Sequence, residues 1–300
     1  MLNILRRIAS TVLLISPTGL FSISGAPNWQ SAVDKATHHE PDARIIVIDV
    51  SSGHMLGAYH LEDAARSLVA PGSTLKPLIL YSLLKSRNWN AERRIACRGE
   101  LVIAGHALRC SHPRSAPFDA REALAWSCNA YFASIGRMLR PGELGGMLSA
   151  TGILSATGLA PTEARAEFHE PHTPIETQLT VLGIEGVRVT PLELAAAYRW
   201  LANDLSAHTK SLAAATVREG LADSASFGMA SAAGLGAVSV AGKTGTAEGV
   251  NSHKSHGWFA GMTPVSKPQA VIVVYLPTGR GSDAARLAGL ILADSPLRQR

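Results

Sequence analysis

The sequence is low in several features that would point to particular kinds of protein. Only 17% of its 300 residues are charged and 46% are hydrophobic, a balance that argues for a folded core and against disorder. The formal charge is +5; without Arg6 and Arg7 it is 26 basic against 23 acidic residues, or +3. That excess is too small to indicate a nucleic-acid partner. Repeats and low-complexity tracts are absent as well, so the sequence indicates one globular unit.

Cysteine is also scarce, with three residues in the chain. Cys97 and Cys110 flank a short, glycine-containing segment that is typical of a hairpin. In an oxidising compartment the two can form a disulfide, which would contribute roughly 3 kcal/mol in the entropy model. The alternative is a pair of reduced, half-buried thiols. His106 and His112 lie nearby, but the spacing matches no structural zinc pattern, and we expect no metal site.

The first 26 residues have the pattern of a leader. Arg6 and Arg7 precede an apolar stretch over residues 8–23, and small residues continue to Ala26. Polar residues and a proline interrupt the stretch, so it is more typical of a secretory signal than of a full membrane span. Pro27 argues against cleavage directly before it. We therefore expect a signal peptide or an N-terminal membrane anchor, an extracytoplasmic location, and a single domain over residues 27–300.

The first chemical motif is the S-T-L-K string from Ser73 to Lys76, between Pro71-Gly72 and an apolar run. A glycine followed by helix formers predicts a turn that leads into a helix, where residues three apart share a face. Pro77 fits only in the first turn of that helix. A lysine buried there loses solvation, so its pKa falls and a fraction becomes the neutral amine. Lys76 is therefore the candidate general base for a Ser73 nucleophile.

The second motif is Ser127-Cys128-Asn129, inside a predicted helix over residues 120–139. Asp119 and Glu122 form a D-x-x-E capping box that starts this helix. On a regular helix the first and third motif residues diverge by about 200°, so they would not face the same site. We therefore expect a local break near Cys128.

The third motif is the string Lys243, Thr244, Gly245 and Thr246, where β-branched and small residues alternate with glycines. This pattern is typical of an exposed edge strand whose glycines allow close approach of a ligand. A peptide can pair with such an edge by strand addition, with its carboxylate next to Lys243.

The distribution of the remaining patterns predicts the fold. Strands are expected at both ends of the chain, over residues 44–50, 54–59, 238–246, 257–261 and 270–275, and the long middle is helical. We expect an α+β protein with a five-stranded antiparallel sheet flanked by helices and an all-helical subdomain. Residues 283–292 have the pattern of a closing amphipathic helix.

With its three motifs in this order, the chain resembles the transpeptidase domain of penicillin-binding proteins, within the superfamily that includes serine β-lactamases. Further similar segments are the expected hairpin from Ile45, Arg66 ahead of the first motif, residues 183–195 and residues 256–261. Thr190 begins the helix in the third of these segments, with a proline and a glutamate after it. The resemblance runs from about residue 43 to the C-terminal helix.

This resemblance implies a role for each motif residue. Ser73 is the nucleophile that forms the acyl-enzyme, and Lys76 is its base. Ser127 relays a proton towards the leaving amine, helped by Lys243, and Asn129 holds the peptide backbone.

The remaining implied roles concern substrate binding. Thr244 and Thr246, with Gly245 between them, bind the substrate carboxylate, and the backbone amides of Ser73 and Thr246 form an oxyanion hole. The implied substrates are peptidoglycan stem peptides, with β-lactams as covalent inhibitors. Neither a metal nor another cofactor is needed for this chemistry.

The resemblance leaves several activities open. A D,D-carboxypeptidase or endopeptidase differs from a transpeptidase in the group that accepts the acyl chain. A β-lactamase needs fast deacylation, but the sequence contains no E-x-x-L-N string for a deacylating glutamate. A non-catalytic β-lactam-sensing module would keep Ser73 without turnover.

Overall fold

The structure is a computed structural model that describes residues 28–38, 40–86, 88–110, 112, 117–235, 238–248 and 255–299. The predicted leader, residues 1–26, lies outside these ranges. Among the residues described, every helix is too short or too polar to cross a membrane.

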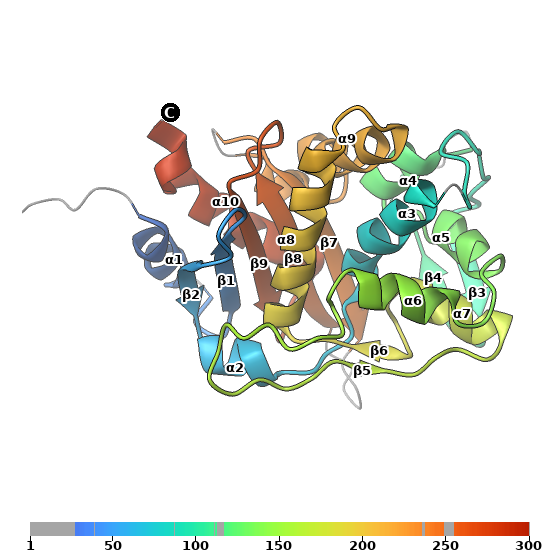
Figure 1. The fold of residues 1–300 in the computed structure, drawn as a ribbon, viewed down its shortest axis with the longest axis horizontal. Helices are drawn as coiled ribbons and strands as arrows, with labels where there is room; N and C mark the ends of the chain where they lie inside the picture. Colours follow the sequence, from blue (N-terminus) through green and yellow to red (C-terminus); the bar gives the residue numbers. More distant parts are fainter. Residues whose placement is uncertain are drawn as a thin grey trace, which may run out of the picture.

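The described residues contain one five-stranded sheet, with strand order β2-β1-β9-β8-β7 (Figure 1). All neighbouring strands are antiparallel, as the sequence predicts. The predicted strands are confirmed, with ends shifted by up to three residues: β1 (Arg44–Asp49), β2 (Met55–Tyr59), β7 (Ala241–Glu248), β8 (Ser255–Thr263) and β9 (Ala270–Leu276). The third motif lies in β7, at one edge of the sheet.

Helices cover both faces of this sheet (Figure 1). Side chains alternate along β1: Ile45 packs towards α1 (Trp29–Thr37) and α10 (Gly281–Ala293), whereas Ile46 packs towards α8 (Pro191–Ala207). The short helix α2 (Leu61–Arg66) also contacts β1. Because both faces are covered, all seven residues of β9 are buried. The sheet is thus a rigid centre for the rest of the molecule.

The middle of the chain forms the predicted helical part, beside the β7 edge (Figure 1). Its helices are α3 (Lys76–Lys85), α4 (Ala120–Ala125), α5 (Asn129–Gly136), α6 (Glu143–Ala150), α7 (Pro174–Val181) and α9 (Leu212–Ser226). Two small antiparallel pairs accompany them: the hairpin of β3 (Glu100–Ile103) with β4 (His106–Arg109), and β5 (Glu167–Phe168) with β6 (Val187–Arg188), which α7 separates in the sequence. The 3₁₀ segments are η1 (Gly72–Leu75), η2 (Ser231–Ala233) and η3 (Pro296–Gln299).

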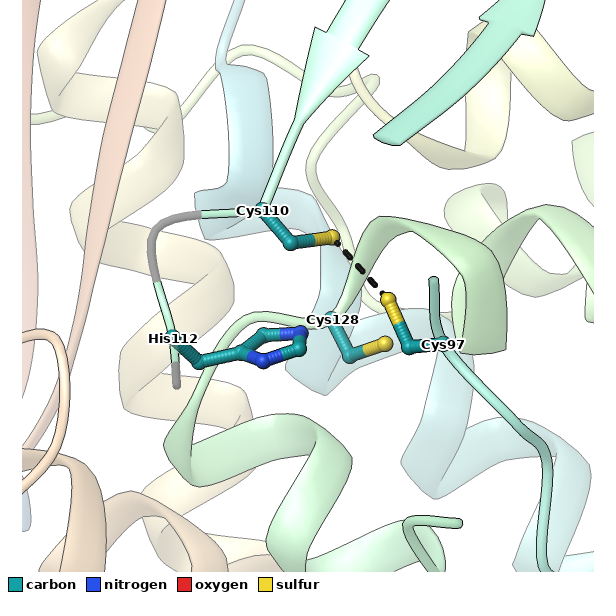
Figure 2. A group of neighbouring side chains, drawn as sticks. All are labelled: Cys97, Cys110, His112 and Cys128. Atoms are coloured by element: carbon teal, nitrogen blue, oxygen red, sulfur yellow. Dashed lines mark hydrogen bonds between the residues drawn. The ribbon is translucent and has the colours of Figure 1, made fainter. Parts of the chain in front are cut away.

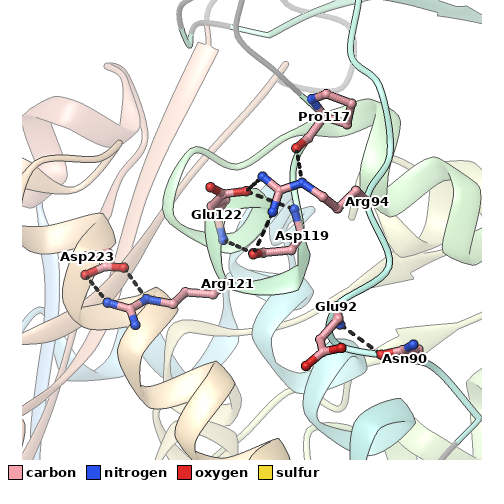
Figure 3. A network of polar contacts seen from close by, with 8 residues as sticks. All are labelled: Asn90, Glu92, Arg94, Pro117, Asp119, Arg121, Glu122 and Asp223. Atoms are coloured by element: carbon pink, nitrogen blue, oxygen red, sulfur yellow. Dashed lines mark hydrogen bonds and ion pairs between the residues drawn. The ribbon is translucent and has the colours of Figure 1, made fainter.

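A polar network fixes the start of α4 (Figure 3). The predicted capping box is present: Asp119 accepts from the Glu122 backbone N–H at 2.9 Å, and the Glu122 carboxylate accepts from the Asp119 N–H at 3.0 Å. Arg94 donates to Glu122 at 2.8 Å and to the Pro117 carbonyl oxygen at 2.9 Å. The helix that leads to Ser127 is therefore held at its beginning.

A second contact in the same region ties α4 to α9 (Figure 3). Arg121 on α4 donates two hydrogen bonds to Asp223 on α9, at 2.6 Å and 3.1 Å. A planar guanidinium that meets a carboxylate in this bidentate way fixes orientation as well as distance. The contact therefore restrains how α4 lies against the helical part.

Helix α8 begins with the predicted capping box. Thr190 is buried, accepts from the Glu193 N–H at 3.1 Å and donates to the Glu193 carboxylate at 3.0 Å. Glu193 also accepts from the Ala166 N–H at 2.7 Å, so the cap joins a distant loop to the helix.

Replacement of the buried cap tests its contribution to stability. We expect Thr190→Ala to lower the free energy of unfolding by about 1–2 kcal/mol, because buried donors and acceptors lose their partners. Thr173 caps α7 in the same T-P-x-E pattern but is exposed, so Thr173→Ala should cost only about 0.5 kcal/mol. Urea unfolding measures both values, and equal losses would contradict the importance of burial.

Candidate active site

The predicted nucleophile lies in a turn that leads directly into a helix. Ser73 is the second residue of η1 and is half-buried, and Lys76 is the first residue of α3. Pro77 follows within the first turn, as the sequence predicts. The buried Tyr198 hydroxyl on α8 donates to the Thr74 carbonyl oxygen at 2.9 Å. The turn is therefore fixed from the centre of the molecule.

Ala70, directly before Pro71, fixes the same turn at a second point. The Ala70 carbonyl oxygen accepts from Trp258 Nε1 at 3.0 Å and from His256 Nε2 at 3.1 Å. Both donors lie on β8 and face the same side of the sheet. Burial lowers the pKa of His256, which favours the neutral ring. Sequence reasoning missed this anchor because its acceptor is a backbone oxygen.

Lys76 joins the first motif to the second. Its ammonium nitrogen donates to the Ser127 carbonyl oxygen at 3.0 Å, to Ser127 Oγ at 3.2 Å and to Asn129 Oδ1 at 2.8 Å. It also lies 5.1 Å from the centre of the Phe132 ring. An ammonium group has three hydrogens, so these three acceptors satisfy it completely. The structure thus brings three predicted site residues into direct contact.

Burial changes the acid–base behaviour of Lys76. The side chain is fully buried, and loss of solvation lowers its pKa to about 8. The nearby sulfur atoms of Cys110 and Cys128 act in the opposite direction. With this pKa, a useful fraction of the amine is neutral near physiological pH and can accept a proton.

The predicted break between α4 and α5 is confirmed at the second motif. Helix α4 ends at Ala125, α5 begins at Asn129, and Ser127 between them has a left-handed backbone with φ of 55°. This conformation costs a non-glycine residue of order 1–3 kcal/mol. The break lets Ser127 and Asn129 both reach Lys76, which a straight helix would prevent.

Lys243 in the third motif is a second fully buried amine. Its nitrogen donates to the Thr244 carbonyl oxygen at 2.9 Å, and its side chain is fully buried. Burial, with the positive charge of Lys76, lowers the pKa of Lys243 well below its usual value. A lowered pKa favours the neutral form of this amine.

Gly245 lets β7 pack against the turn that carries Ser73. A Cβ atom at this position would lie 2.7 Å from the Pro71 carbonyl oxygen and 3.1 Å from the Thr74 side chain. The sequence predicts that the glycines of the third motif allow a ligand to approach closely. In the structure, Gly245 instead allows close approach of the turn that carries Ser73. The first and third motifs are therefore in contact.

The two threonines of the third motif have other partners. Thr246 is exposed, and its hydroxyl accepts from the Gly281 N–H at 3.0 Å, at the start of α10. The Thr244 hydroxyl lies 3.5 Å from the Met229 carbonyl oxygen. The carboxylate-binding role of both threonines stays a prediction.

All three cysteines are free thiols in the structure. Cys97 Sγ lies 3.6 Å from Cys110 Sγ, and the predicted hairpin β3–β4 connects them. Cys128 is buried immediately before α5. Of the two states that the sequence leaves open for Cys97 and Cys110, the structure has the reduced one.

Comparison with known proteins identifies the family. The family model described as the penicillin-binding protein transpeptidase domain matches residues 43–294. Since this match covers most of the chain, the protein belongs to that family, with a peptidoglycan-related function, and the predicted resemblance is confirmed. A search of curated protein sequences finds no match.

Solved structures share the fold at low sequence identity. A peptidoglycan glycosyltransferase from Burkholderia ambifaria aligns with a TM-score of 0.76 and 21% identity, over 88% of this chain and 92% of that one. The transpeptidase domain of Burkholderia pseudomallei penicillin-binding protein 3 gives 0.76 and 21%, over 89% and 95%. Pseudomonas aeruginosa penicillin-binding protein 2, in complex with WCK 5153, gives 0.77 and 21%, over 89% and 73%.

The packing at Gly245 leads to a stability prediction. We expect Gly245→Ala to destabilise the fold by roughly 1–3 kcal/mol, because the new methyl group would lie only 2.7 Å from the Pro71 carbonyl oxygen and 3.1 Å from the Thr74 side chain. Gly146 on α6 has open space at its Cβ position, so Gly146→Ala should be neutral or stabilising by up to about 1 kcal/mol. Thermal and urea unfolding measure both, and a neutral Gly245→Ala would contradict the described packing.

Proposed function

We propose that this protein is a serine D,D-transpeptidase that cross-links peptidoglycan stem peptides through an acyl-enzyme on Ser73. The observation that carries the proposal is the buried Lys76 amine, hydrogen-bonded to Ser127 and Asn129, in the helix that begins three residues after Ser73. A hydroxyl nucleophile needs a base beside it, and this amine has a pKa lowered to about 8. Membership of the family supports the same assignment.

In this proposal the reaction proceeds by two acyl transfers. Ser73 Oγ attacks the carbonyl carbon between the two terminal D-alanines and gives its proton to Lys76. The proton passes through the Ser127 hydroxyl, 3.2 Å from the amine, to the nitrogen of the leaving D-alanine. The amine of a second stem peptide then attacks the ester, returns its proton by the same route and releases Ser73.

The remaining residues bind the substrate in this proposal. Asn129 holds the peptide backbone, and the β7 edge pairs with the extended peptide. Lys243, with Thr244 and Thr246, attracts the terminal carboxylate. The backbone amides of Ser73 and Thr246 stabilise the oxyanion, an effect worth roughly 3 kcal/mol per donor in a comparable enzyme.

The proposed substrate implies that the protein acts outside the cytoplasm. Stem peptides are found in the cell wall, so we propose that the leader, residues 1–26, directs export of the domain. The leader is then either cleaved off as a signal peptide or kept as a membrane anchor. β-Lactams would acylate Ser73 as covalent inhibitors.

Covalent labelling by a fluorescent penicillin tests the nucleophile. We expect Ser73→Ala to abolish labelling, because the atom that forms the ester is removed, and Lys76→Ala to reduce it at least about 100-fold. Ser82→Ala, in the same helix, should label like the parent. Labelling of Ser73→Ala at the parent rate would contradict the proposal.

The rate at which the label is released separates the related activities. Slow release supports a transpeptidase, and cross-linked dimers formed from two stem peptides then distinguish it from a carboxypeptidase, which yields only the trimmed peptide. Release within seconds indicates a β-lactamase, and failure of the parent to label indicates a non-catalytic module.

The lowered pKa of Lys76 predicts a pH dependence. Below about pH 8 most of the amine is protonated and accepts no proton, so the labelling rate should rise roughly tenfold per pH unit from about pH 6 and level off above about pH 8. Lys243, Cys110 and Cys128 are the other titratable groups that act on it, and the free energy of unfolding over the same range is the control. A flat or falling rate between about pH 6 and about pH 8 would contradict the role of Lys76 as base.

A further inference from the structure

Four side chains from separate parts of the chain meet beside the second motif (Figure 2). Cys97 precedes β3, Cys110 follows β4, His112 lies two residues further on, and Cys128 directly precedes α5. Each offers one ligand atom, and these atoms all lie within 4.8 Å of one another. Folding thus gathers three thiols and an imidazole around one point.

The chemistry of this group matches one metal ion in particular. Thiolate and imidazole ligands suit Zn²⁺, and a Cys₃His set fills its four tetrahedral positions. With Zn–S bonds of about 2.3 Å, tetrahedral geometry places two sulfur atoms about 3.8 Å apart. The observed distance from Cys97 Sγ to Cys110 Sγ is 3.6 Å.

The surroundings of the four ligands resemble an outer shell of a metal site. The Asn129 backbone N–H donates to Cys110 Sγ at 3.3 Å. The His112 ring packs edge-on against Phe118, with 4.6 Å between the ring centres. Such contacts orient ligands before the metal binds. His112 and Cys128 are buried, whereas Cys97 and Cys110 are half-buried.

We propose that Cys97, Cys110, His112 and Cys128 bind one structural zinc ion. The thiols lose their protons to solvent when the ion binds, and no electron is transferred. All four positions of the metal are filled by the protein, so the ion has no open site for substrate. This assignment is independent of the function proposed above.

Because Cys128 belongs to the second motif, a zinc ion bound to it affects the active site. Cys128 stands between Ser127 and Asn129, both of which accept hydrogen bonds from Lys76. A zinc bond to Cys128 fixes the chain at the break where Ser127 has its left-handed backbone. The ion therefore acts as a positioning element for the Lys76 contacts, and only this effect on acylation depends on the proposed function.

The spacing of the ligands explains why the sequence does not indicate this site. Twelve residues separate Cys97 from Cys110, one separates Cys110 from His112, and 15 separate His112 from Cys128. Structural zinc motifs are usually found through two closely spaced ligand pairs. Only the turn of the β3–β4 hairpin and the break before α5 bring these four together.

The first test measures metal on the full chain. The protein is purified under reducing conditions without chelator, and its zinc is measured by elemental mass spectrometry. We expect one zinc per chain, and one cobalt(II) per chain after exchange, with thiolate-to-cobalt charge-transfer absorption. Protein with intact thiols that takes up neither ion from zinc chloride or cobalt chloride would overturn the proposal, as would a Cys97–Cys110 disulfide in metal-free protein from the native compartment.

Matched variants locate the ion. We expect Cys110→Ser and His112→Gln each to weaken zinc binding more than the 10- to 100-fold typical of removing an outer-shell partner. His106→Gln is the control, because His106 pairs with Glu185 at 3.0 Å and lies outside the cluster. Cys97→Ser replaces a half-buried ligand and keeps the test valid if Cys110→Ser fails to fold. Unchanged affinity in a folded ligand variant would overturn the assignment.

A final comparison tests the zinc site and the proposed acylation of Ser73 independently of each other. Ser73→Ala should retain one zinc while it loses penicillin labelling, whereas the zinc-free parent should retain Ser73 and label more slowly. If labelling fails in the parent while zinc remains bound, the proposed function is wrong and the metal site stands. If labelling is normal and zinc never binds, the metal site is wrong and the proposed function stands.

Discussion

The arrangement of the site depends on how one buried charge is satisfied. An ammonium group inside a protein must find acceptors, and Lys76 finds three, two on Ser127 and one on Asn129. These acceptors are available only because the helix is broken and Ser127 has a left-handed backbone. The cost of that conformation is offset by the hydrogen bonds to Lys76 and by the capped, ion-paired helix α4 before it. Burial of the same amine lowers its pKa, so the constraint that shapes the second motif also favours the neutral amine that the proposed base requires.

The sheet fixes the turn that carries Ser73 relative to the β7 edge. The turn that carries Ser73 is held by the Ala70 carbonyl contacts from β8 and by Tyr198 from α8. Gly245 lets β7 approach the turn on its other side. β7 lies at one edge of the sheet, the position that the proposed pairing with an extended peptide requires. The turn with Ser73 and the β7 edge are therefore held against each other by packing contacts.

Local patterns in the sequence predict much of this fold. Alternation and apolar runs identify the five strands, and the box at Thr190 and the proline after it locate the start of α8. Geometry along a helix also predicts the break near Cys128. Contacts between residues far apart in the sequence could not be predicted in this way. Every residue has a backbone carbonyl oxygen, so an acceptor such as that of Ala70 cannot be recognised from the residue type. The cysteine cluster combines ligands whose spacing matches no short motif, and the hydroxyl of Thr246 turns to a helix start 35 residues away.

The most direct measurement is the titration of Lys76 itself. Carbon-13 labelling of lysine side chains, with assignment by the signal lost in Lys76→Arg, allows its pKa to be read by NMR while the fold is monitored in the same spectra. A midpoint of about 8 is the predicted result, because the amine is fully buried and bound to Ser127 and Asn129. A midpoint near the ordinary lysine value of 10.5 would show a solvated amine and contradict the assignment of Lys76 as the base.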